Sequence, residues 1–252
     1  MRELLPSIVS NALYVVSFLL IIAGLFVFSV VIERLLGRKK ATAEKTSPAR
    51  RAAFIGLLSA LSAVLMLFEV PMPFVPSFYK LDLSELPVLI GAFAFGPSAG
   101  VLIEFLKILL KLLMKPTSTA FVGELANFAV GASFILPAAS IYYANKTKRS
   151  AFISCIAGTL CMTVFGTFFN AVYLLPAFAK LYGMPLDAIL SMGSEVNPFA
   201  GDNIVTFVIA CVAPLNLIKG AVSSGLTLLV YKKISPVLKG VGSELQRDRP
   251  PA

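Results

Sequence analysis

The feature that most constrains this chain is a series of long apolar runs with almost no charged residues. They cover Ile8–Ile32, Ala52–Phe68, Phe121–Tyr143, Phe152–Tyr173 and Ile204–Tyr231. A helix needs about 20 mainly apolar residues to cross the hydrocarbon core of a bilayer. The strands of a membrane barrel would instead show short segments of alternating polarity. The chain is therefore predicted to be an all-α integral membrane protein.

Composition excludes the two main alternatives. Hydrophobic residues make up 58% of the 252 residues and charged residues only 14%, against about 25% charged residues in ordinary soluble domains. Such a chain cannot cover a core with polar surface, and it is far too apolar to be intrinsically disordered.

Proline and glycine divide the chain further. Pro87–Met114 is too long for one straight span, and Gly96-Pro97 interrupts it, which predicts two helices joined by a tight turn at Gly96–Gly100. The segment Glu69–Pro87 holds three closely spaced prolines, which exclude a regular helix and predict a structured outer loop. Leu174–Asp202 is expected to be a second, long outer connection.

These boundaries give seven membrane helices and divide the chain into four regions. We expect an N-terminal transmembrane helix at 1–36, a basic linker at 37–51, a six-helix core at 52–235 and a polar tail at 236–252 that is disordered from Gly240 onward.

The net charge of +9 is concentrated in three clusters, at 34–51, 146–149 and 232–239. Lys and Arg next to membrane helices are retained in the cytoplasm, and the seven-helix assignment places all three clusters on one side. The N-terminus is then outside. No aromatic and basic module accompanies the charge, so it indicates orientation in the cell membrane and not nucleic-acid binding.

Several kinds of chemistry are absent from the sequence. There is no His, and neither a Walker A motif nor a G-x-S-x-G or H-E-x-x-H motif occurs. The three Cys show no metal-ligand spacing. We therefore expect no enzymatic activity, no metal and no cofactor, and any ATPase that drives transport must be another chain.

Polar residues at membrane depth are the candidates for a ligand site. Asn216 and Lys219 share one helix face, and Asn170 lies near the outer end of another helix. Together with the aromatic outer loop they predict a pocket for a small, partly aromatic solute. An Asn side chain matches a pyrimidine-dione edge, and a single cation disfavours a multiply phosphorylated ligand. Alternatively, Lys219 reaches the interface and Asn170 bonds a neighbouring helix.

Other charged and small residues allow two interpretations each. Glu104, Lys107 and Lys111 form a stripe on one helix that is either an internal ion pair or part of a site. Asn127 follows Glu124 by three residues on the next helix, and we include it among the candidates. The pair Gly56 and Ala60 permits close helix approach, either within this chain or with a partner.

Four segments in order carry a resemblance to a known family: Leu81–Pro87 (LDLSELP), Phe95–Gly100 (FGPSAG), Ala126–Phe134 (ANFAVGASF) and Pro214–Gly220 (PLNLIKG). From about Arg51 to Ile234 the chain resembles the riboflavin-specific substrate-binding subunit, or S component, of energy-coupling factor transporters. The resemblance implies a six-helix subunit that captures riboflavin from outside. Here one extra N-terminal transmembrane helix precedes that core.

The resemblance also implies site residues and partners. Asn170, Asn216 and Lys219 would bond the isoalloxazine edge, and the loop residues Phe78, Tyr79 and Leu81 would cover the rings. The partners would be the lipid bilayer, a transmembrane coupling subunit and two cytoplasmic ATPases. Gly56 and Ala60 would dock on the coupling subunit. The sequence leaves open whether flavin mononucleotide is carried as well as riboflavin.

The chain departs from the family in three places. The N-terminal helix and its linker lie outside the six-helix core, Ile108 follows Lys107 where Asn is frequent, and the outer segment Gly183–Asn203 is longer than expected. The alternatives to riboflavin are an S component for another vitamin, such as thiamine or a folate-like compound, and a membrane scaffold that binds no solute.

Overall fold

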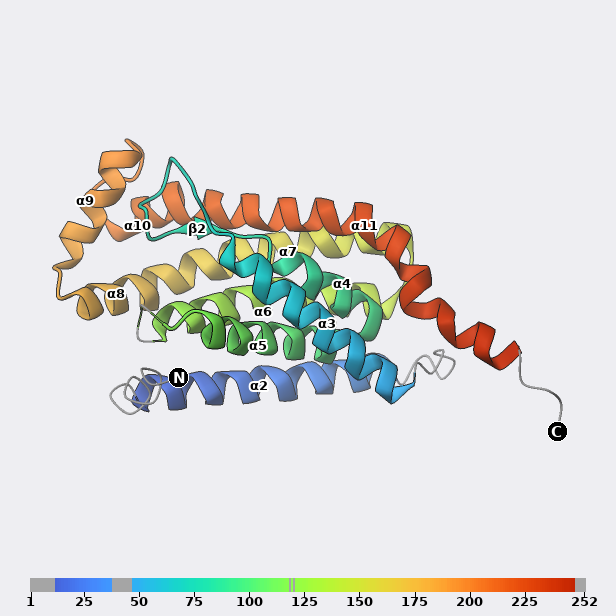
Figure 1. Cartoon of the computed structure of the whole chain (residues 1–252). Helices are drawn as coiled ribbons and strands as arrows, with labels where there is room; N and C mark the ends of the chain where they lie inside the picture. The colour runs from blue at the N-terminus through green and yellow to red at the C-terminus, as the bar shows by residue number, and fades with distance from the viewer. Residues whose placement is uncertain (1–11, 38–46, 118, 120, 248–252) are drawn as a thin grey trace.

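The computed structural model describes residues 12–37, 47–117, 119 and 121–247. Its long helices run side by side as one bundle (Figure 1). They are α2 (Ala12–Gly37), α3 (Pro48–Leu67), α4 (Glu85–Phe95), α5 (Pro97–Met114), α6 (Val122–Ala144), α7 (Lys148–Phe169) and α11 (Ala213–Arg247). The seven predicted helices are thus all present.

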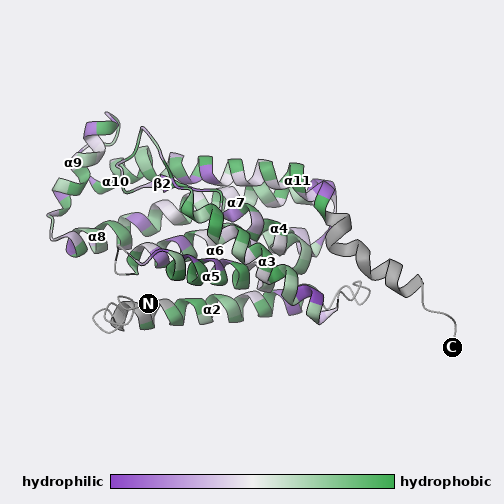
Figure 2. Ribbon diagram, viewed as in Figure 1, coloured by the Kyte–Doolittle hydropathy of each residue, from purple (hydrophilic) through white to green (hydrophobic). Residues whose placement is uncertain are grey.

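Length and apolar composition make five stretches of the described residues long enough to cross a membrane: 19–36, 48–67, 122–144, 148–182 and 204–234. Figure 2 shows apolar residues along the length of the bundle and hydrophilic residues gathered where α2 meets α3 and where α11 leaves the bundle. These hydrophilic ends belong to the predicted basic clusters, so the fold confirms an all-α membrane protein. The central part of the basic linker, 38–46, lies outside the described residues.

The turn between α4 and α5 forms where the sequence predicts it. Gly96 adopts φ +100°, in the region that favours glycine, and Pro97 begins α5. The carboxylate of Glu33, at the end of α2, accepts hydrogen bonds from the backbone N–H (3.1 Å) and the hydroxyl of Ser98. The N-terminal helix is therefore bonded to the core at this turn.

Helix α2 packs along α5 and α6. Ile22 and Leu25 enter an apolar cluster with Ile108 and Phe128, while most other side chains described on α2 face outward. Burial of this narrow apolar stripe, together with the Glu33 contacts, attaches α2 to the six-helix core.

The outer end of the bundle is more helical than predicted. α7 continues through a π-helical turn at Asn170–Leu174 into α8 (Leu175–Tyr182), and α9 (Leu186–Val196) follows. The chain re-enters through α10 (Ile204–Phe207) and a second π-helical turn at Val208–Val212. The long connection predicted at 174–202 is present and largely helical, and apolar residues of α8 and α9 pack with the outer ends of the spans.

The loop after α3 is non-helical, as its prolines predict. Two short antiparallel strands close it, β1 (Val70–Pro71) and β2 (Lys80–Leu81), with Val70 opposite Leu81. At the other end, α11 continues to Arg247, so the prediction of disorder is wrong for residues 240–247. Residues 248–252 lie outside the described part of the chain.

Candidate functional site

A cavity of about 370 Å³ lies between the outer loop, α5, α6, α7 and the start of α11. Its polar lining includes Tyr79, Asp82, Lys111, Glu124, Asn127, Asn170, Asn216 and Lys219. Its apolar lining includes Met66, Phe78, Val130, Met162, Leu174, Phe178, Val212 and Leu215. An apolar pocket with a few convergent polar groups is the usual form of a small-molecule site.

The structure brings together six of the seven candidate ligand residues. Asn170, Asn216, Lys219, Phe78, Tyr79 and Asn127 all line this cavity. Leu81 does not: it pairs with Val70 in the two-stranded sheet and packs in the apolar cluster of the outer end. The alternation of side chains along a strand directs Leu81 away from the cavity that its neighbours face.

Asn170 occupies the first position of the π-helical turn. Its Oδ1 accepts a hydrogen bond of 2.6 Å from the Tyr79 hydroxyl, and its Nδ2 donates to the Gly166 carbonyl at 2.7 Å. Gly166 also has no side chain where the amide of Asn216 approaches it. A glycine at position 166 therefore lets the side chains of Asn170 and Asn216 lie on the same side of the cavity. The π-helical turn is a further indication of a functional site, because such turns are frequent at functional sites.

Lys219 is paired with the loop. Its Nζ lies 2.9 Å from Asp82 Oδ2, and the Ser84 backbone N–H donates to Asp82 Oδ1 at 2.9 Å. Burial raises the pKa of Asp82, but Lys219, Lys107 and the Ser84 bond outweigh burial and lower that pKa to about 2. Asp82 is thus a carboxylate at neutral pH, and Lys219 is buried and paired with it.

The loop tyrosine is equally enclosed. Burial, with a smaller contribution from Cys211, raises the pKa of Tyr79 well above its ordinary value of 10.0. Its hydroxyl therefore stays protonated and acts as the donor to Asn170. Tyr79 and Asp82 together join the outer loop to the π-helical turn at Asn170–Leu174 and to α11 by hydrogen bonds, which holds the loop against that side of the cavity.

The cavity holds more cations than the sequence indicated. Lys80, Lys111 and Lys115 line it in addition to Lys219, so the prediction of a single cation was wrong. Lys111 pairs with Glu124 at 2.9 Å, whereas Lys80 and Lys115 share Glu69 at 2.8 and 3.7 Å. The last two are partly exposed and lie at the mouth. The glutamates that pair with these lysines lie in other segments of the chain, so the sequence spacing alone did not reveal the pairs.

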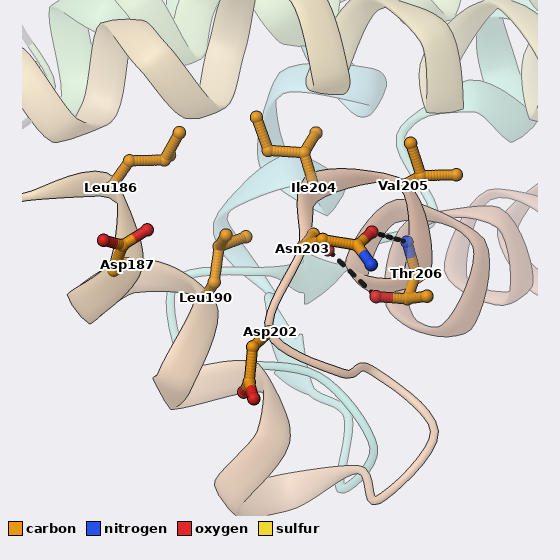
Figure 3. Close-up of a pocket in the computed structure, with 8 residues that line it drawn as sticks. All are labelled: Leu186, Asp187, Leu190, Asp202, Asn203, Ile204, Val205 and Thr206. Carbon is orange, nitrogen blue, oxygen red and sulfur yellow. Dashed lines mark hydrogen bonds between the residues drawn. The ribbon is translucent and has the colours of Figure 1, made fainter.

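A second hollow lies between α9 and α10 on the outer end (Figure 3). Its carboxylates, Asp187 and Asp202, lie apart on different segments. Asn203 is already used there, because its side chain accepts a hydrogen bond of 2.9 Å from the Thr206 N–H at the start of α10. Polar groups do not converge in this hollow, so the closed cavity is the better candidate site.

The face of α3 that carries Gly56 and Ala60 is exposed. A Cβ atom added at Gly56 would meet nothing within 4 Å among the described residues. The buried side of α3 is formed by other residues, including Leu58, Ser62 and Met66. Of the two interpretations of this pair, packing of Gly56 against another described part of the chain is therefore excluded.

The comparisons with known proteins agree with this arrangement. A model of the family "ECF transporter, substrate-specific component" matches residues 50–231. The riboflavin transporter RibU of Staphylococcus aureus is 34% identical over 81% of this chain and 99% of its own length. The riboflavin transporter FmnP of Bacillus subtilis is 30% identical over 72% of this chain and 90% of its own length.

A solved structure is also similar. The S component of a bacterial ECF transporter matches with a TM-score of 0.60 and 34% identity, over 77% of this chain and 99% of that one. The family match begins at residue 50, so α2 lies before it.

Proposed function

This chain belongs to the family of ECF transporter substrate-specific components, and we propose that it captures riboflavin at the outer face of the cell membrane for delivery inward. It is a multi-pass membrane protein of a transporter family, and transport of this kind requires no catalysis by the subunit itself. The proposal rests first on the cavity, which presents the amides of Asn170 and Asn216 and the ammonium of Lys219 beside apolar and aromatic side chains.

The chemistry of the cavity matches a flavin. An isoalloxazine has an apolar ring system and one edge with alternating carbonyl and N–H groups. Asn170 and Asn216 each offer a donor and an acceptor, and Lys219 offers a donor. Phe78 and Phe178, with ring centroids 6.2 Å apart, lie on the lining where aromatic rings of a ligand can pack.

We extend the proposal to flavin mononucleotide because of the charges at the mouth. Lys80 and Lys115 share the single carboxylate of Glu69, which leaves one cation for a phosphate on the flavin tail. With the neutral tail of riboflavin, the remaining positive charge would be compensated only by solvent. Substitution of Lys115 by Met should therefore weaken binding of flavin mononucleotide more than binding of riboflavin.

The proposed partners follow from the family and from the exposed face of α3. We propose that a transmembrane coupling subunit packs on Gly56 and Ala60, where small residues permit close helix approach. Two cytoplasmic ATPases would supply the energy, because this sequence has no Walker A motif.

The test is a titration of the detergent-purified protein with riboflavin, followed by quenching of flavin fluorescence. Lys219→Met should weaken binding roughly 10- to 100-fold, since a hydrogen bond to a charged group contributes about 1.5–3 kcal/mol. Lys148→Met is the matched control, because Lys148 is exposed at the far end of α7. Thiamine and folate should not compete.

Other outcomes separate the alternatives. Displacement of riboflavin by thiamine or folate, or binding of these compounds alone, would assign the subunit to another vitamin. A protein that binds none of the compounds would support the scaffold interpretation. Equal riboflavin affinity of the Lys219 and Lys148 variants would remove Lys219 from the site.

A further inference from the structure

Beside the cavity, five charged side chains meet in the interior of the bundle. They come from the outer loop, α4, α5 and α11, and they are Asp82, Glu85, Glu104, Lys107 and Lys219. Each is at most 8% exposed, and Glu104 and Lys107 are fully buried. Charged groups at membrane depth are costly, and such groups are usually functional.

The cluster has three carboxyl groups for two ammonium groups. Lys107 Nζ lies 2.6 Å from Glu104 Oε1 and 3.0 Å from Glu85 Oε1. Lys219 Nζ lies 2.9 Å from Asp82 and 3.6 Å from Glu85. If all five groups were ionised, one negative charge would remain without compensation, and such a charge costs several kcal/mol in a protein interior.

Hydrogen bonding shows the same deficit independently of the charge count. Glu85 Oε2 and Glu104 Oε2 are buried and have no hydrogen-bond donor among the described residues. Gly131 of α6 lies against the cluster, because a Cβ atom there would overlap the Glu104 carboxylate and come within 3.1 Å of Glu85 Oε1. Glycine at this position therefore lets the two carboxyl groups approach α6 closely.

We propose that this cluster is a proton-binding site and that Glu104 holds the proton at neutral pH. One proton balances the charges and adds an O–H donor where two acceptors lack one. Glu104 is the member with the weakest compensation, since its one cation is shared with Glu85, whereas Asp82 also accepts the Ser84 N–H. A metal ion does not fit this role: the described residues form no metal-binding group, and the Lys107 ammonium is adjacent.

Glu124 provides a contrast within the same molecule. It is also buried, but Lys111 pairs with it at 2.9 Å and the hydroxyls of Thr117 and Thr119 donate to it at 2.9 and 3.2 Å. Its charge and its acceptors are satisfied, so Glu124 needs no proton. The two carboxyl groups are thus a matched pair for a test.

Infrared spectroscopy of the ligand-free protein tests the proposal directly. A protonated carboxyl group has a C=O stretching band that a carboxylate lacks and that shifts in D₂O. We expect this band in the wild type at neutral pH, its loss in Glu104→Gln, and its retention in Glu124→Gln. Absence of the band from the wild type, or its persistence in Glu104→Gln, would overturn the assignment.

Thermal unfolding as a function of pH is the second measurement. In the unfolded chain Glu104 is exposed and ionises with a pKa of about 4.3, so folding at neutral pH has to take up a proton. The wild type should therefore lose stability as the pH rises from about 5 into the alkaline range, whereas Glu104→Gln should lack this dependence and be at least as stable as the wild type at neutral pH. A Glu104→Gln protein that is strongly destabilised at neutral pH would instead indicate an ionised Glu104. Both tests use protein without flavin, so their failure is distinct from failure of the riboflavin proposal.

Discussion

The hydrogen bond from Tyr79 to Asn170 joins the outer loop to a residue that we assign to the ligand. The Tyr79 hydroxyl lies 2.6 Å from Asn170 Oδ1. If the flavin edge donates to Asn170 Oδ1 in place of Tyr79, this contact is exchanged on binding. A neutral hydrogen bond contributes about 1 kcal/mol net, and about 1.4 kcal/mol is tenfold in affinity. Tyr79→Phe removes the competing bond, so riboflavin affinity should rise about fivefold.

The assay is the fluorescence titration described above, with Tyr182→Phe as the matched control. Tyr182 also lines the cavity, and its ring stack with Phe178 survives the change. The control should bind riboflavin as the wild type does. Weaker binding by Tyr79→Phe would refute the reasoning, because the hydroxyl would then contact the flavin. An unchanged affinity would also refute it, because the bond would then be the same in both states.

Three further predictions concern docking, packing and proton coupling. Gly56→Trp should leave riboflavin affinity unchanged but abolish co-purification with a coupling subunit, since the exposed face of α3 would no longer permit close approach; normal co-purification would contradict this. Gly131→Ala should lower the free energy of unfolding by about 1–3 kcal/mol, because the added Cβ atom would overlap the Glu104 carboxylate. A Cβ atom added at Gly225 meets nothing within 4 Å, so Gly225→Ala is the control and should be neutral in thermal unfolding. Calorimetric titration of riboflavin in buffers of different ionisation enthalpy should detect proton uptake, because Lys219 turns from the acidic cluster to the ligand; identical heats in all buffers would exclude coupling.

The sequence predicts the membrane helices well because the bilayer imposes length and polarity on each span separately. The apolar runs, the break at Gly96 and the proline-rich loop each depend on local composition, and all three were confirmed in the fold. The convergence of Asn170, Asn216 and Lys219 was also foreseen, since polar groups at membrane depth tend to face a common cavity.

Interactions between distant segments were not predictable in the same way. The partner of Lys219 is Asp82, 137 positions away, and only the folded bundle brings the two together. The stripe of Glu104 and Lys107 suggested an internal pair, but Glu85 of α4 changes its charge balance. The Leu81 side chain points away from the cavity because Leu81 pairs with Val70 in a sheet whose strands have only two residues each. Strands this short leave no periodic pattern in the sequence.

The attachment of α2 also bears on the area of bilayer that the subunit occupies. α2 packs along α5 and α6 and bonds the α4–α5 turn through Glu33, whereas the Gly56 face of α3 stays bare. The flank formed by α5 and α6 therefore meets lipid partly through α2, whereas α3, α7 and α11 present exposed apolar side chains of their own. With α2 attached, the subunit occupies a wider area of the bilayer than the part matched by the family, residues 50–231, would occupy alone.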